Sequence, residues 1–245
     1  MELLFLGQGR LYEALGIRRG VTALVGGGGK TSAMLRLGKE LAALGKVVIA
    51  TTTHIFPPQG MPVLLEPNAQ ALASALERFP LACAGSPRAG GKLGPCGLAA
   101  EALMAMADYV LLEADGAKGK PLKAPAPHEP VIPPCTGAVV AVAGLDGLGS
   151  PIGEAAFRPE LYAGLLGVEQ SHIVAPADAA KVLCSREGQY KGVGPGMDFF
   201  VLLNKADDET RRALGERTAA ALDAARVKGV VIARLGRRPQ ERTGL

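Results

Sequence analysis

The chain has 245 residues, of which 48% are hydrophobic and 20% are charged, and its formal net charge is +4. This composition excludes an intrinsically disordered chain, because such chains lack the apolar side chains needed to build a core. Aromatic residues make up only 4% of the chain and tryptophan is absent, so we expect no nucleic-acid partner that is bound by base stacking.

Apolar runs alternate with helical patterns along the chain. A helix is expected over residues 31–44, where Met34, Leu37 and Leu41 recur on one face, and another over residues 208–228. Apolar strands separated by helices are typical of a mainly parallel sheet with helices on both faces. We therefore expect one α/β domain over residues 1–245, with ligands beyond the carboxyl ends of its strands. The expected strands are residues 21–25, 46–50, 109–112, 138–143, 199–203 and 230–235.

A glycine-rich loop lies between the first of these strands and the first helix. Its sequence is Gly26-Gly27-Gly28-Gly29-Lys30-Thr31-Ser32, a shortened P-loop, since Leu24 stands where the full GxxxxGK[ST] pattern has glycine. Glycines let backbone N–H groups surround a phosphate, and the positive end of the helix dipole adds to the attraction. We expect Lys30 to contact phosphate oxygens and the hydroxyl of Thr31 or Ser32 to bind Mg²⁺. The pattern predicts a P-loop NTPase-like fold that binds GTP or ATP.

Polar residues follow the next two strands. Thr53 and His54 end the run Thr51-Thr52-Thr53-His54, where they would reach a metal, a water or the terminal phosphate, although such a run also occurs simply as a strand end. Glu113 and Asp115 come after the strand at 109–112, as the carboxylate of a Walker B motif does. At least one of these two acids is expected to bind Mg²⁺ together with Thr31. We expect both to take part in catalysis with Lys30.

Residues 116–136 are expected to form a long loop without regular structure, because they contain six prolines. Lys118, Lys120 and Lys123 lie in this loop. The sequence leaves open whether these lysines close over an anionic substrate or are solvated surface charges.

The segment Asn204-Lys205-Ala206-Asp207 follows the strand at 199–203 and matches the NKxD motif of P-loop GTPases. The aspartate of that motif accepts two hydrogen bonds from guanine N1 and N2, and adenine does not present these donors. We therefore expect Asn204, Lys205 and Asp207 to bind the base, which favours GTP over ATP by a small margin. Asp207 or Asp208 would also cap the following helix.

Signals for export or membrane insertion are not recognisable. Residues 1–6 carry Glu2 and no basic residue, and no run reaches 18 apolar residues. We expect a cytoplasmic protein with reduced thiols and no membrane partner. Arginines near the end of the chain are expected to be solvated rather than a nucleic-acid arm: Arg234, Arg237, Arg238 and Arg242.

Over nearly all its length the sequence resembles the YqeC-type family of accessory proteins for selenium-dependent molybdenum hydroxylases. The resemblance runs through residues 26–31, 51–54, 91–94, 113–123, 128–130 and 204–207. It implies a nucleotide-binding protein that helps to mature such an enzyme. The expected partners are the hydroxylase or its other maturation factors, and the expected activity is that of a slow P-loop NTPase.

Two alternatives remain open. The glycine loop, Glu113 and residues 204–208 also resemble the ATP-binding half of Mur-type ligases, which would imply ATP and the formation of an acyl phosphate. The second alternative is a non-catalytic, nucleotide-gated chaperone that delivers selenium or a cofactor.

Overall fold

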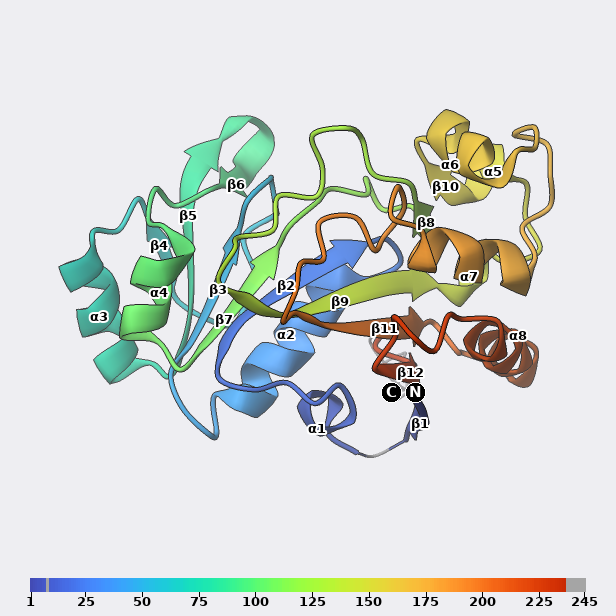
Figure 1. Ribbon diagram of the computed structural model, residues 1–245. Helices are drawn as coiled ribbons and strands as arrows, with labels where there is room; N and C mark the ends of the chain where they lie inside the picture. The colour runs from blue at the N-terminus through green and yellow to red at the C-terminus, as the bar shows by residue number, and fades with distance from the viewer. Residues whose placement is uncertain (8, 237–245) are drawn as a thin grey trace, which may run out of the picture.

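A ten-stranded sheet forms the centre of the computed structural model, which describes residues 1–7 and 9–236 (Figure 1). In spatial order its strands are β1 (Glu2–Leu6), β12 (Gly229–Ala233), β11 (Asp198–Asn204), β9 (Thr136–Gly144), β2 (Gly20–Gly26), β7 (Tyr109–Glu113), β3 (Val47–Thr51), β5 (Leu81–Arg88) and β4 (Val63–Leu65), with β6 (Lys92–Gly94) on β5. Neighbouring strands pair in parallel except β5 and β6. The expected α/β fold with a mainly parallel sheet is confirmed.

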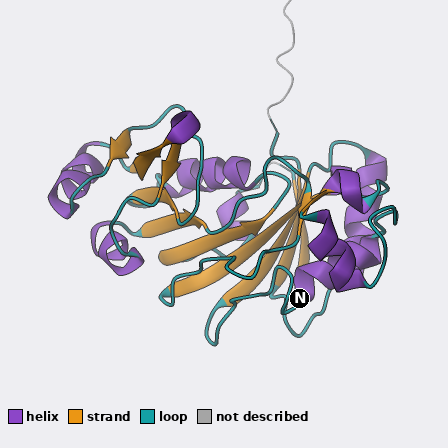
Figure 2. Ribbon diagram, turned by 90° about the horizontal axis from the view of Figure 1, so that it is seen from above, coloured by secondary structure: helices purple, strands orange, loops and turns teal. Residues whose placement is uncertain are grey.

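Helices cover both faces of the sheet (Figure 2). Along β9, Val140 and Val142 belong to the core beneath α1 (Leu11–Ala14) and α2 (Lys30–Leu41), whereas Val139 and Ala141 face the opposite core. Alternate residues of a strand point to opposite faces, so a strand apolar at every position needs cover on both sides. The helices of the opposite face are α3 (Ala69–Arg78), α4 (Ala100–Met106), α7 (Pro176–Cys184) and α8 (Glu209–Ala220). None of the helices in the described ranges is long and apolar enough to cross a bilayer.

The second expected helix ends earlier than its apolar pattern predicts. It was expected to run to residue 228, but α8 ends at Ala220. The carboxylate of Asp223 accepts a hydrogen bond from Ala225 N at 3.0 Å, and its backbone carbonyl accepts one from Val227 N. Asp side chains favour such turns over continued helix. Of the arginines near the end of the chain, Arg237, Arg238 and Arg242 lie outside the described residues.

Residues 116–136 contain a short strand, so the expectation of a loop without regular structure is wrong. This strand, β8 (Leu122–Lys123), pairs in parallel with β10 (Ala156–Phe157). The segment is fixed at its start, since Gly144 N donates to Pro121 O at 2.9 Å. The adjoining helices are α5 (Ile152–Ala155) and α6 (Pro159–Leu166), above α7 in Figure 1. Buried apolar residues, Leu122 among them, hold β8 against the core.

Candidate functional site

The glycine loop joins β2 to α2 at the carboxyl edge of the sheet. Its backbone has positive φ at Gly26 (93°), Gly28 (72°) and Gly29 (124°). A Cβ atom at Gly28 would lie 2.1 Å from Gly144 N, and one at Gly26 would lie 2.3 Å from Val142 O. Both the backbone conformation and the close approach of β9 therefore require glycine in this loop.

The free backbone donors of the loop lie at the start of α2. Gly27 N donates to Val142 O at 2.9 Å and Gly28 N to Lys120 O at 3.0 Å, so these two groups are engaged within the protein. Within the described part of the chain, the N–H groups of residues 29–32 have no acceptor. They sit at the positive end of a 12-residue helix, which attracts anions. Fewer backbone N–H groups are thus available to an anion than a loop of four glycines suggests.

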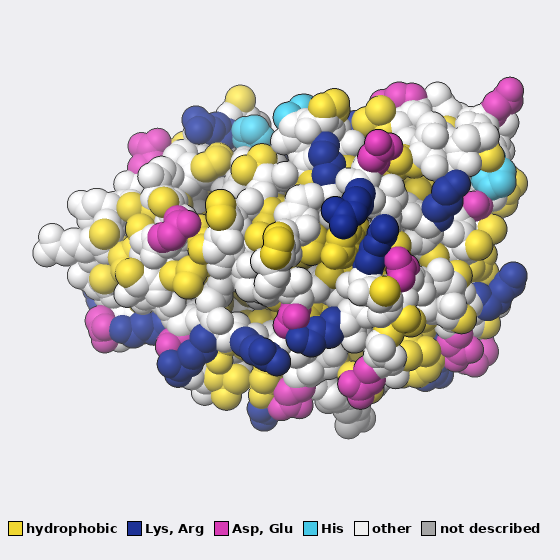
Figure 3. Space-filling view, in the orientation of Figure 1, with side chains coloured by type: hydrophobic (Ala, Val, Ile, Leu, Met, Phe, Trp, Pro, Cys, Tyr) yellow, Lys and Arg dark blue, Asp and Glu magenta, His cyan; other side chains and the backbone are white. Residues whose placement is uncertain are grey.

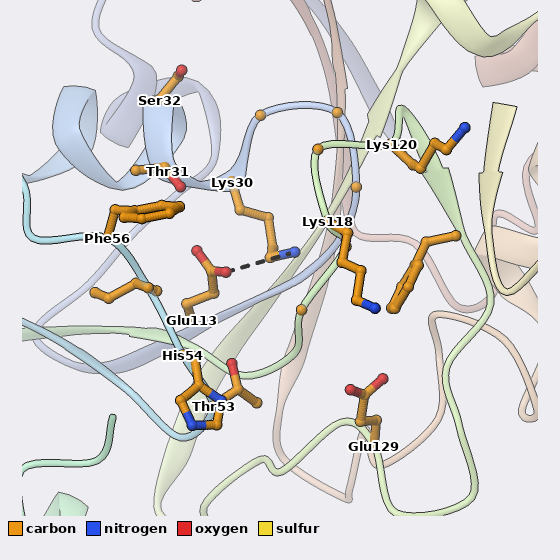
Figure 4. Close-up of a pocket in the computed structure, with 18 of the residues that line it drawn as sticks. Lys30, Thr31, Ser32, Thr53, His54, Phe56, Glu113, Lys118, Lys120 and Glu129 are labelled. Carbon is orange, nitrogen blue, oxygen red and sulfur yellow. Dashed lines mark ion pairs between the residues drawn. The ribbon is translucent and has the colours of Figure 1, made fainter. Parts of the chain in front are cut away.

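Lys30 and the two acids after β7 come together, as the sequence predicts. Lys30 is only 5% exposed, and its Nζ lies 3.0 Å from Asp115 Oδ1 and 4.0 Å from Glu113 Oε1. It also donates to the backbone carbonyl of Gly26. Figure 4 shows the ion pair of Lys30 with Glu113 next to Thr31. The ammonium group of Lys30 therefore faces the carboxylates of Glu113 and Asp115.

Asp115 is fully buried beneath the glycine loop, and both of its carboxylate oxygens are engaged. Gly26 N donates to Oδ1 at 3.1 Å and to Oδ2 at 3.0 Å. The Nζ of Lys123 lies 2.8 Å from Oδ2, opposite Lys30 on Oδ1. Asp115 thus ties the loop, Lys30 and Lys123 into one buried group.

The buried charges continue from Lys123 to Arg158. The Nζ of Lys123 lies 2.7 Å from Glu129 Oε2, and Arg158 donates to both oxygens of Glu129 at 2.6 and 3.2 Å. Burial by itself would raise the pKa of Glu129, but the hydrogen bonds from Arg158 and Lys123 lower it to about 2. Since the side chain of Lys123 is fully buried between two acids, it does not close over a substrate. Lys123 is therefore neither a residue that closes over an anionic substrate nor a solvated surface charge.

Glu113 keeps one carboxylate oxygen free of protein partners. Its Oε2 is buried and has no hydrogen-bond partner among the described residues. Burial raises the pKa of Glu113, and the charge of Lys30 and the hydroxyl of Thr31 act in the opposite direction. An unpartnered carboxylate oxygen beside a threonine hydroxyl provides the oxygen ligands that Mg²⁺ prefers. These two residues therefore fit a magnesium ion.

A cavity of about 610 Å³ opens in front of the loop. Thr53 and His54 line it, as expected for the end of β3 (Figure 4). Thr53 N donates to Thr51 Oγ1 at 2.9 Å, and that hydroxyl donates to Glu113 O at 3.0 Å. The hydrogen bonds of the strand end thus fix the position of Thr53, while His54 is exposed.

Only part of the 204–207 segment reaches this cavity. Asn204 donates to Gly28 O at 2.8 Å, and Lys205 lines the cavity while pairing with Asp146 at 2.6 Å. Asp207 instead lines a second hollow of about 310 Å³ beside the ends of β1 and β12 and the start of α8. Its carboxylate pairs there with Arg211 at 3.0 Å and with Arg234 at 3.3 Å.

Sequence reasoning did not single out Phe157 or Arg158, which line the cavity. They follow α5 in a stretch of the chain that matches no motif. The only local signal is Pro159 directly after them, which is favoured at the first position of a helix.

A family model described as YqeC protein matches residues 22–160 of the chain. The uncharacterized protein YqeC of Escherichia coli (strain K12) is 35% identical over 195 residues, which cover 76% of this chain and 75% of the relative. No solved structure gives a significant match. The matched residues include the glycine loop, Glu113, Asp115 and Arg158. The chain belongs to the YqeC family.

Proposed function

We propose that the protein binds a Mg²⁺ nucleoside triphosphate at the N-terminus of α2. The observation that carries this proposal is the set of free N–H groups at residues 29–32, beside Lys30 and the unpartnered Oε2 of Glu113. Thr31 and Glu113 would hold the metal, directly or through water, and Mg²⁺ supplies positive charge at the phosphates when bound. Asp115 positions the loop and Lys30 in this scheme, because both of its oxygens are already engaged.

Calorimetric titration with GTP and ATP, each with and without Mg²⁺, tests the proposal. Wild-type protein should bind triphosphate more tightly with Mg²⁺ than without it. Glu113→Gln should reduce this magnesium effect by about 10-fold, because an amide oxygen carries no charge for the ion. Glu216→Gln, which changes an exposed acid on α8, is the control and should keep the full effect. Failure to bind either nucleotide would remove the proposal.

The nature of the base is the finer part of the proposal, and we favour GTP over ATP. Asn204 and Lys205 flank the glycine loop, and the side chain of Asp207 is 40% exposed. Asp207 lies outside the cavity, and its pairs with Arg211 and Arg234 compete with a guanine, so we expect only a small preference. Asp207→Asn should lower the ratio of GTP to ATP affinity by up to about 10-fold, since an amide accepts fewer hydrogen bonds. Parallel titrations of Asp208→Asn give the control, and an unchanged ratio in Asp207→Asn contradicts guanine recognition.

The cellular role that we propose follows the family resemblance. Nucleotide binding and slow hydrolysis would serve the maturation of a selenium-dependent molybdenum hydroxylase, with that enzyme or its maturation factors as partners. A ligase-like activation of a second substrate is the second candidate. The lining of the cavity favours it, because Lys118 and Arg158 line it in addition to the residues at the start of α2.

A further inference from the structure

Several cations that line the cavity have an uncommon backbone conformation. The non-glycine residues with positive φ are Glu66 (47°), Lys118 (46°), Arg158 (61°) and Lys205 (67°). Residues with a Cβ atom rarely adopt this left-handed conformation, and such strain concentrates at functional sites. All of these residues except Glu66 are cations that line the cavity.

Two of these cations lie against the same aromatic ring. The Nζ of Lys118 is 5.4 Å and the guanidinium carbon of Arg158 is 4.5 Å from the centroid of Phe157. Figure 4 shows Lys118 between Lys30 and Glu129, apart from Thr31 and Ser32 at the start of α2. Phe157 thus contacts both cations, and Lys118 lies apart from the start of α2.

Carboxylates neutralise some of these cations but not all of them. Arg158 is paired with Glu129, and Lys205 is paired with Asp146. No carboxylate oxygen of the described residues lies within 4.0 Å of Lys118 Nζ. The space-filling view shows several Lys and Arg side chains near the middle of the face in view, with acidic side chains beside them (Figure 3).

We propose that Lys118 and Arg158, held against Phe157, form a second anion subsite for the phosphate or carboxylate group of a small second substrate. The subsite rests on the proposed function, because the triphosphate would occupy the donors at α2 and leave this side of the cavity to another molecule. A cavity of about 610 Å³ is within the range of small-molecule sites. Lys118 is exposed, and its contact with the ring of Phe157 places its ammonium group beside the cavity.

Residue-resolved NMR titration of the whole chain tests this subsite. The protein is first saturated with Mg²⁺ and the β,γ-imido analogue of GTP, and inorganic phosphate or acetate is then added in separate titrations. We expect the amide signals of Gly119 and Phe157 to shift with one or both anions, which distinguishes a phosphate from a carboxylate ligand. Lys118→Gln should weaken this binding at least 5-fold, whereas Lys39→Gln on the exposed side of α2 should not change it.

A second pair of variants separates the backbone from the charge. In Lys118→Gly and Glu66→Gly the backbone keeps its positive φ but loses the Cβ atom that makes this conformation unfavourable, so each should raise Tm by about 2–4 °C. Only Lys118→Gly should abolish the anion-dependent shifts, because Glu66 does not line the cavity. Unchanged shifts in folded Lys118→Gly would overturn the subsite.

The location of the shifts separates failure of the subsite from failure of the proposed function. If the analogue does not bind, the anions are titrated into the free protein. Shifts at Gly119 and Phe157 then support the subsite although the triphosphate proposal has failed. Shifts confined to residues 29–32 overturn the subsite and leave an anion site at α2.

Discussion

Asp115→Asn is expected to lower the free energy of unfolding by about 3–5 kcal/mol. Asp115 is fully buried, and its oxygens compensate the charges of Lys30 and Lys123 at 3.0 and 2.8 Å. An asparagine can still accept a hydrogen bond from Gly26 N, but it leaves two buried ammonium groups with less negative charge. Urea unfolding of the wild type and the variant measures the difference.

An exposed ion pair gives the matched control for this variant. Asp198 pairs with Lys228 at 2.7 Å near the start of β11, and its side chain is 31% exposed. Asp198→Asn should therefore cost only about 0–1 kcal/mol, because exposed ion pairs contribute little. Equal losses in the two variants would show that the charges around Asp115 are compensated by other means.

Six strands of the fold were predictable because they are buried on both faces: β2, β3, β7, β9, β11 and β12. β2, β9 and β11 are apolar at almost every position, and this local property marks a central strand of a parallel sheet. The strands β1, β4, β5, β6, β8 and β10 were not predicted. Of these, β1 lies at the edge of the sheet and pairs with β12 alone among the described strands. None of its residues is fully buried, and five residues with Glu2 among them do not stand out from a polar terminus.

The candidate site was predictable only where its residues are adjacent in the sequence. The glycine loop and Lys30 form one continuous motif, and the acids after β7 follow a recognisable strand. Lys123, Glu129 and Arg158 instead meet through tertiary packing, across 35 residues between the first and the last. No short pattern predicts that a lysine in a proline-rich segment turns inward between two carboxylates.

The separation of Asp207 from the cavity has a similar origin. The NKxD pattern predicts that Asn204 binds the base, and in the structure its amide donates to Gly28 O of the glycine loop. The pattern says nothing of Arg211, one helical turn later, or of Arg234 at the end of β12. A base would have to compete with these two arginines for the carboxylate of Asp207.

Lys30→Ala is expected to weaken binding of the Mg²⁺ triphosphate by about 10- to 100-fold. A hydrogen bond to a charged group contributes about 1.5–3 kcal/mol. Lys30 is the first residue of α2, so its ammonium group can reach a phosphate bound there. In the present state its Nζ faces Asp115 and Glu113, so it would have to turn toward the phosphates when the nucleotide binds. Calorimetric titration of the folded variant measures the loss.

The matched control is Lys39→Ala, which removes an exposed lysine from the last turn of the same helix. It should leave the affinity unchanged, because Lys39 does not line the cavity. Lys30→Ala also removes a partner of buried Asp115, so its unfolding midpoint must be measured alongside binding. A variant that is folded at the titration temperature and binds triphosphate as tightly as the wild type would mean that Lys30 only balances the buried acids. The phosphate site would then depend on the free N–H groups of α2 alone.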